Sequence, residues 1–140
     1  SRLDWALVPE TDALIVTLGG NYLLRGIAPT ESRANLEAIL AGAAKRGLPV
    51  LLVGMQAPGN YGPDYKAEFD AIYPELAAAQ GTLLAEGFFA PLLQGNDDPA
   101  ALAPYLQADG IHPNAEGVTR IVEGLGPKVL ELLDLVPDQG

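Results

Sequence analysis

The only histidine of the chain, His112, lies in the segment Asp109-Gly110-Ile111-His112-Pro113-Asn114. An imidazole titrates near neutral pH and can act as a general base toward a nucleophile. Asp109 stands three residues earlier. If the loop folds back, its carboxylate can bond the Nδ1–H, fix the tautomer and stabilise the imidazolium, leaving Nε2 facing outward. The same residues also allow a simpler interpretation, in which His112 is a surface residue beside a helix-capping Asn114.

A second candidate, Gly19-Gly20-Asn21-Tyr22, directly follows the apolar run of residues 13–18. Two glycines let the backbone turn sharply and approach a ligand closely. The side-chain amide of Asn21 can then point an N–H donor at a developing oxyanion, which is a large term in acyl-transfer catalysis. An ordinary strand-to-loop turn uses the same residue types, so this alternative stays open.

A third candidate is the loop of residues 57–63, which follows the second apolar run at 49–54. Its residues Pro58 and Tyr61 could form an apolar wall of a ligand-binding cleft. A rigid surface turn is the alternative.

The elements that must position these segments alternate between strands and helices. Residues 13–18 and 49–54 are short, nearly continuous apolar runs, typical of strands buried on both faces of a parallel sheet, and residues 82–85 predict a third, weaker strand. Between them we expect a helix from Pro29 to Gly47 and another capped by Asp64 and running to about residue 79.

The rest of the chain predicts one more helix and an irregular stretch. We expect Pro74 to kink or split the second helix, residues 95–108 to be irregular, and Asn114 to cap a final helix that bends near Gly124, Gly126 and Pro127. This order of elements predicts parallel strands joined by crossovers in an α/β sandwich. Ligands of such sheets bind beyond the carboxyl ends of the strands, where all three candidate segments belong.

Composition limits the classes of function. The 140 residues make one domain, and the net charge of −10 argues against a nucleic-acid partner. The absence of cysteine excludes a disulfide framework and, with a single histidine, leaves no basis for a zinc site. The carboxylates Asp97, Asp98, Glu68 and Asp70 are expected to face solvent. No metal or organic cofactor is therefore expected.

Taken together, the residues Leu18-Gly19-Gly20-Asn21 after a strand and the segment 109–114 before the last helix resemble the GDSL, or SGNH, hydrolase family. Residues 23–27 (LLRGI), 60–62 (NYG) and 71–74 (AIYP) are similar to its bacterial thioesterase I, lysophospholipase and arylesterase branch. The resemblance spans the whole chain. It implies a single domain with a flavodoxin-like three-layer α/β/α sandwich that hydrolyses esters and thioesters through a Ser-His-Asp triad.

The resemblance also implies roles for individual residues. His112 would be the general base, Asp109 its orienting partner and Asn21 the oxyanion-hole side chain. In this branch an Asp usually follows that Asn, and Tyr22 stands there instead, which bears on substrate preference. The substrate would lie against a set of residues around these three: Gly20, Tyr22, Leu23, Leu24, Pro58, Tyr61 and Ile111.

The nucleophile is not among these residues. The family's Gly-Asp-Ser motif and its second glycine block are absent, and the only serines are Ser1 and Ser32, neither at the family's position. We therefore expect the carboxyl-terminal portion of such a domain, lacking a strand–helix–strand segment of roughly 55 to 60 residues. The strand at 13–18 would then have an unpaired apolar edge.

Several expectations about partners and function depend on this absence. A complementary segment carrying Gly-Asp-Ser, or self-association, would cover the edge. By resemblance, the location would be periplasmic or secreted. The alternatives are an acetyl transferase or carbohydrate esterase on the same fold, or a non-catalytic fragment that only associates with a complementary chain.

Overall fold

A computed structural model describes residues 2–137 of the chain. Its sheet contains β1 (Leu14–Thr17), β2 (Val50–Val53) and β3 (Leu83–Ala85), paired in parallel in the order β1-β2-β3. Ile15 pairs with Leu51, which in turn pairs with Leu83. The predicted parallel sheet is therefore confirmed. All residues of β2 are buried, as the continuous apolar run indicated.

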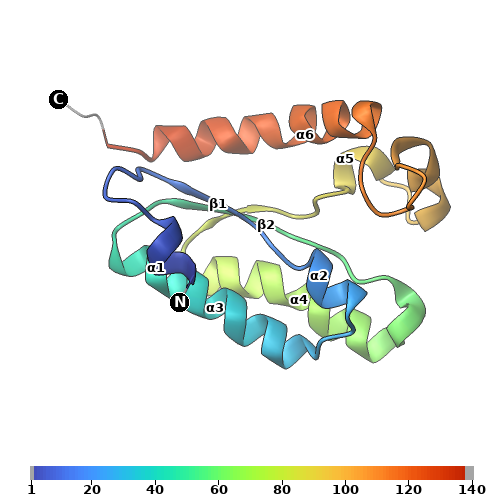
Figure 1. Cartoon of the computed structure of the whole chain (residues 1–140), viewed down its shortest axis with the longest axis horizontal. Coiled ribbons are helices and arrows are strands. Elements are labelled where there is room, and N and C mark those ends of the chain that lie inside the picture. The colour runs from blue at the N-terminus through green and yellow to red at the C-terminus, as the bar shows by residue number, and fades with distance from the viewer. Residues whose placement is uncertain (1, 138–140) are drawn as a thin grey trace.

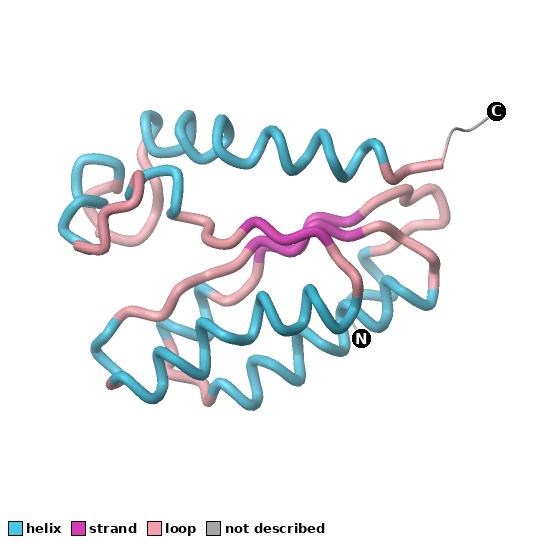
Figure 2. The backbone as a smooth tube through the Cα atoms, turned by 180° about the vertical axis from the view of Figure 1, so that it is seen from behind, coloured by secondary structure: helices cyan, strands magenta, loops and turns pink. Residues whose placement is uncertain are grey.

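The long helices form a layer on each side of this sheet. Figure 1 shows α3 (Pro29–Lys45) and α4 (Pro63–Gln80) below the sheet and α6 (Ala115–Asp134) above it, and Figure 2 shows the same layers from behind. The architecture is thus an α/β/α sandwich. The short elements are α1 (Arg2–Ala6), α2 (Gly20–Leu24), α5 (Ala90–Leu93) and the 3₁₀ turns η1 (Gly59–Tyr61) and η2 (Pro99–Tyr105).

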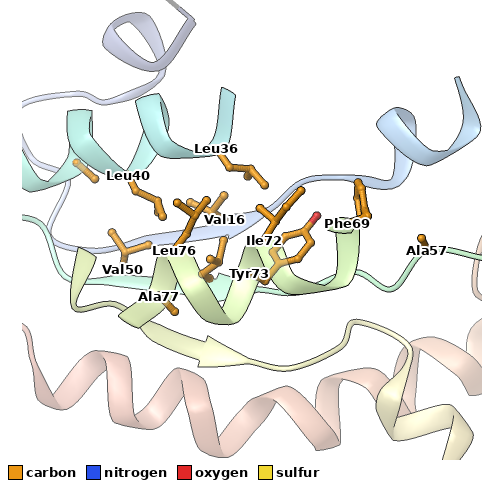
Figure 3. Close-up of a cluster of buried hydrophobic side chains, with 12 residues drawn as sticks. Val16, Leu36, Leu40, Val50, Ala57, Phe69, Ile72, Tyr73, Leu76 and Ala77 are labelled. Carbon is orange, nitrogen blue, oxygen red and sulfur yellow. The ribbon is translucent and has the colours of Figure 1, made fainter. Parts of the chain in front are cut away.

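The main core lies between the sheet and the α3–α4 layer. There Val16 and Val50 of the sheet share a cluster with Leu36 of α3 and with Phe69 and Ile72 of α4 (Figure 3). A smaller cluster on the opposite face joins residues of the sheet to α6: Leu51, Val53, Ala85 and Leu132. Alternate residues of β2 thus serve the two faces, which is the pleat of a strand buried on both sides. The same expectation was wrong for β1, where Val16 is buried against the α3–α4 layer but Ile15, on the opposite face, is exposed because β1 lies at the edge of the sheet.

The expected N-cap of α4 was wrong. Asp64 lies within its first turn, and the helix begins at Pro63 after Gly62, which adopts φ 95°. Proline suits the first position because the N–H that it lacks would have no partner within the helix. Pro74 does not split α4, which continues to Gln80.

The carboxyl-terminal half also differs in part from expectation. The stretch predicted to be irregular contains η2, whose start is capped by the Asp98 carboxylate accepting from the Ala100 N–H at 2.9 Å. Asn114 caps α6 as predicted, its side-chain oxygen accepting from the Gly117 N–H at 2.9 Å. The helix α6 is assigned as one unbroken element through Pro127.

We expect Leu40→Ala to lower the free energy of unfolding by about 2–5 kcal/mol, because it opens a cavity in the main core. Leu40 is 1% exposed on α3, whereas Leu130 of α6 is 64% exposed. The matched control Leu130→Ala should change stability by less than about 0.5 kcal/mol. Urea denaturation followed by circular dichroism measures both, and equal losses would contradict the assigned core.

Candidate active site

The carboxylate of Asp109 is hydrogen-bonded to both the side chain and the backbone of His112 across a tight turn. Its Oδ2 lies 2.7 Å from the imidazole Nδ1, while its Oδ1 accepts from the backbone N–H groups of Ile111 at 2.9 Å and His112 at 3.0 Å. Gly110 adopts φ 68°, a left-handed conformation that glycine takes without steric cost. Because an ionised carboxylate only accepts hydrogen bonds, Nδ1 carries the proton and Nε2 is the basic nitrogen.

The surrounding loop fixes this pair at the start of α6. The Gln107 N–H donates to the His112 carbonyl at 2.7 Å, and Leu106 and Pro113 form an antiparallel bridge. The Asn114 side chain caps α6 and also donates to the Pro104 carbonyl at 2.8 Å. The backbone on both sides of His112 is therefore held, although 70% of its side chain is exposed.

The electrostatics of the pair favour an ionised Asp109. The hydrogen bond from His112 is the largest influence, followed by the two backbone N–H groups, and together they lower the pKa of Asp109 from 3.8 to about 2. The carboxylate therefore stays charged at any pH at which an imidazole can change protonation, as an orienting and charge-balancing partner must.

Asn21 lies in α2, a single helical turn directly after β1. Gly19 precedes this helix with φ 133°, and a Cβ at that position would overlap the Tyr73 hydroxyl, so the close approach requires glycine. Asn21 is exposed, and its carbonyl accepts from the Arg25 N–H at 3.1 Å. The sharp turn predicted from the paired glycines thus carries a solvent-facing amide side chain.

The other residues expected beside a substrate divide into two groups. Gly20 is half-buried at the start of α2, and Tyr22 and Leu23 are half-buried and pack against the main core. The exposed group consists of Leu24, Pro58, Tyr61 and Ile111. The Tyr61 hydroxyl donates to the Leu23 carbonyl at 2.8 Å, which brings the loop after β2 against the segment after β1.

Both halves of the candidate site lie beyond the same end of the sheet. Figures 1 and 2 show α2 and the turn that leads into α6 at the end where the parallel strands finish. Two surface hollows, of about 460 and 190 Å³, are lined by neither Asn21 nor the Asp109–His112 pair. The larger one lies between α3 and α4, and the smaller one is lined by Gln56, Asp70, Pro74, Leu84 and Glu86.

A clamp beneath the loop after β2 was not expected. Asp70 was predicted to face solvent, yet its Oδ1 accepts from the Ala57 N–H at 2.7 Å and its Oδ2 from Lys66 Nζ at 2.7 Å. Lys66 also donates to the Ala57 carbonyl at 2.8 Å. The four-residue spacing of Lys66 and Asp70 along a helix predicts that the two side chains meet. It does not predict that both also bind the backbone of Ala57.

The serines within the described residues offer no exposed hydroxyl. Ser32 is fully buried in α3 and donates to the Ala28 carbonyl at 3.3 Å, while Ser1 lies outside the described residues. Across residues 2–137, no three His, Cys, Asp or Glu side chains gather as a metal-binding group. No helix in the same range combines the length and apolar character needed to cross a bilayer.

Comparison with known proteins shows the family of the chain. Residues 1–120 match the GDSL-like lipase/acylhydrolase family, and the chain belongs to that family. Esterase TesA of Pseudomonas aeruginosa is 39% identical over 95% of this chain and 63% of its own length. Thioesterase 1/protease 1/lysophospholipase L1 of Escherichia coli is 34% identical over 86% of this chain and 55% of its own length.

Solved structures agree with the fold. The crystal structure of TesA superposes with a TM-score of 0.78 at 35% identity, covering 94% of this chain and 69% of that one. The esterase EstA from Pseudoalteromonas sp. superposes with a TM-score of 0.80 at 25% identity, covering 95% of this chain and 69% of that one. The sandwich is therefore the SGNH-hydrolase fold, and the chain spans a little over half to about two thirds of these relatives.

We expect His112→Ala to raise the pKa of Asp109 toward 3.8, because it removes the largest of the influences that lower it. In the unchanged chain the carboxyl titrates near pH 2. Its depressed pKa therefore stabilises the fold above about pH 4, and that contribution is lost as the pH falls through about 2. Carbon-13 NMR of the Asp109 carboxyl measures both midpoints, and equal midpoints would show that the imidazole has no such influence.

Proposed function

We propose that this chain provides the general base and part of the oxyanion hole of a serine ester hydrolase. The observation that carries the proposal is the 2.7 Å contact between Asp109 Oδ2 and His112 Nδ1, which leaves Nε2 as the basic nitrogen of a fixed and exposed ring. Membership of the GDSL-like lipase/acylhydrolase family supports it.

The proposed reaction proceeds through an acyl-enzyme. Nε2 of His112 takes the proton of a serine hydroxyl as that oxygen attacks the ester carbonyl, and Asp109 balances the imidazolium charge. The Asn21 amide donates to the tetrahedral oxyanion. His112 then protonates the leaving alcohol or thiol, and water, activated by the same nitrogen, hydrolyses the acyl-enzyme.

We propose that the serine comes from a Gly-Asp-Ser segment outside this sequence. Ser32 is buried, and the relatives are longer than the part that this chain matches. The β1 edge suits such a segment. On the sheet face that packs against α6, Ile15 of β1 is 47% exposed, and α6 is the one long helix that covers this face among the described residues. Val122 and Leu133 of α6 are also exposed. A strand pairing with β1 and a helix beside α6 would bury these residues.

The substrates proposed are small carboxylic esters and thioesters with acyl or aryl groups. The names of relatives support this class: an esterase, a thioesterase 1/protease 1/lysophospholipase L1 and, from Vibrio mimicus, an arylesterase that is 28% identical over 134 residues. The proposed machinery uses no metal or organic cofactor. A periplasmic or secreted location is proposed from family resemblance.

We expect the purified chain alone to leave p-nitrophenyl butyrate unhydrolysed and to gain turnover when co-expressed with a Gly-Asp-Ser segment taken from a relative. A fluorophosphonate probe should label the serine of that segment, and His112→Ala should abolish the labelling because the base is lost. Intact mass and light scattering would identify the complex. Turnover by the chain alone that disappears on Ser32→Ala would overturn the proposal.

We expect Asn21→Ala to lower kcat of the assembled hydrolase by about 10²–10³ with KM little changed, because the donor acts on the transition state. Asn21→Asp should be at least as damaging, since it puts a negative charge near an oxyanion. Asn35→Ala, an exposed asparagine of α3, is the matched control. Steady-state kinetics measure kcat and KM of each variant. A similarly small effect of Asn21→Ala and Asn35→Ala would contradict the proposed role of Asn21 in the oxyanion hole.

A further inference from the structure

Four aromatic residues follow one another at four-residue spacing from η1 along α4: Tyr61, Tyr65, Phe69 and Tyr73. Side chains four apart on a helix lie on the same face. Successive ring centroids are accordingly 4.9, 6.1 and 5.9 Å apart, so the rings form a continuous aromatic ladder.

The three hydroxyl groups of this ladder all donate to one segment, residues 18–27. Tyr73 donates to the Leu18 carbonyl at 2.7 Å, Tyr61 to the Leu23 carbonyl at 2.8 Å and Tyr65 to the Ile27 carbonyl at 2.7 Å. The segment is thus anchored at both ends and in the middle. Figure 3 shows the Tyr73 hydroxyl directed at the chain leaving β1. Burial raises the pKa of Tyr73, which keeps its phenol protonated as a donor.

Glycines allow two of these approaches. Gly19 faces the Tyr73 hydroxyl so closely that no Cβ fits, and a Cβ at Gly26 would lie 3.1 Å from the Tyr61 ring. Both glycines have positive φ, 133° and 60°. Segment 18–27 can therefore pack closely against the ladder because glycine stands at both points of contact.

We propose that Tyr61, Tyr65 and Tyr73 are positioning residues that hold Asn21 in place for the oxyanion; this rests on the role proposed above for Asn21. The helix α2 has five residues and no side-chain cap, and an isolated helix of that length is not stable in water. The direction of the exposed Asn21 side chain therefore depends on tertiary anchors. The ladder supplies them from η1 and from α4, whose inner face is buried in the main core.

The first test uses NMR of the full chain and needs no catalysis. Tyr61→Phe, Tyr65→Phe and Tyr73→Phe each remove one hydroxyl, and each should shift the Asn21 side-chain amide signals and speed hydrogen exchange at Leu23, Arg25 and Ile27. Tyr105→Phe, whose ring packs under Arg120, is the matched control and should do neither. Unchanged Asn21 signals in all three ladder variants would overturn the proposal. Tyr61 is 40% exposed, so its variant keeps the test valid if Tyr73→Phe fails to fold.

The second test uses kinetics of the chain assembled with its serine-bearing segment. Each ladder variant should lower kcat about tenfold with KM changed less than about twofold, as expected of a displaced catalytic group. In the Asn21→Ala background the same changes should have less than about a twofold effect, because their target is gone. Equal losses in both backgrounds would mean a merely structural role. If the assembly shows no turnover, the proposed function fails, and the NMR result still decides the ladder.

Discussion

Burial of β2 on both faces is the constraint on which the rest of the structure depends. Val50–Val53 are wholly buried between the α3–α4 layer and α6, so the central strand exists only inside a sandwich. β2 has a parallel neighbour on either side, and parallel strands must be joined by crossover connections. The carboxyl ends of all three strands therefore lie at the same edge of the sheet. The segments after β1 and β2 therefore lie at one end of the molecule, and the turn before α6 lies at the same end.

Within that frame, the candidate chemistry is built from short loops that supply their own rigidity. Asp109 both closes the turn and bonds the imidazole, so the proposed orienting group also supports the backbone that carries the proposed base. Asn21 is different, because tyrosine hydroxyls of η1 and α4 donate to the segment around its short helix. The proposed base is thus positioned locally, and the proposed oxyanion donor depends on tertiary contacts.

The free edge of β1 connects the fold to the proposed function. Ile15 and the exposed apolar residues of α6 lie where a further strand and helix would cover them. A Gly-Asp-Ser segment that paired there would add its serine beside β1, the strand that leads into the helix of Asn21. Completing the sheet and completing the proposed triad would then be one event.

Local patterns were enough to predict the Asn114 cap and the contact of Asp109 with His112, because each depends on residues three positions apart in the chain. The parallel pairing of distant strands followed instead from the alternation of strands and helices along the chain. The first residue of α4 was missed, since Asp64 and Pro63 compete for neighbouring positions that only the folded turn at Gly62 decides. The short helix α2 was also missed, because five residues carry no periodicity.

The support that distant segments give one another could be seen only in the folded chain. The clamp of Asp70 on Ala57 and the tyrosine bonds to residues 18–27 join groups as far as 55 positions apart in the chain. The sequence by itself determined which groups could do chemistry and at which end of the strands they fall. Their orientation came from packing, because a hydroxyl has no preferred carbonyl until the core brings one within 3 Å of it.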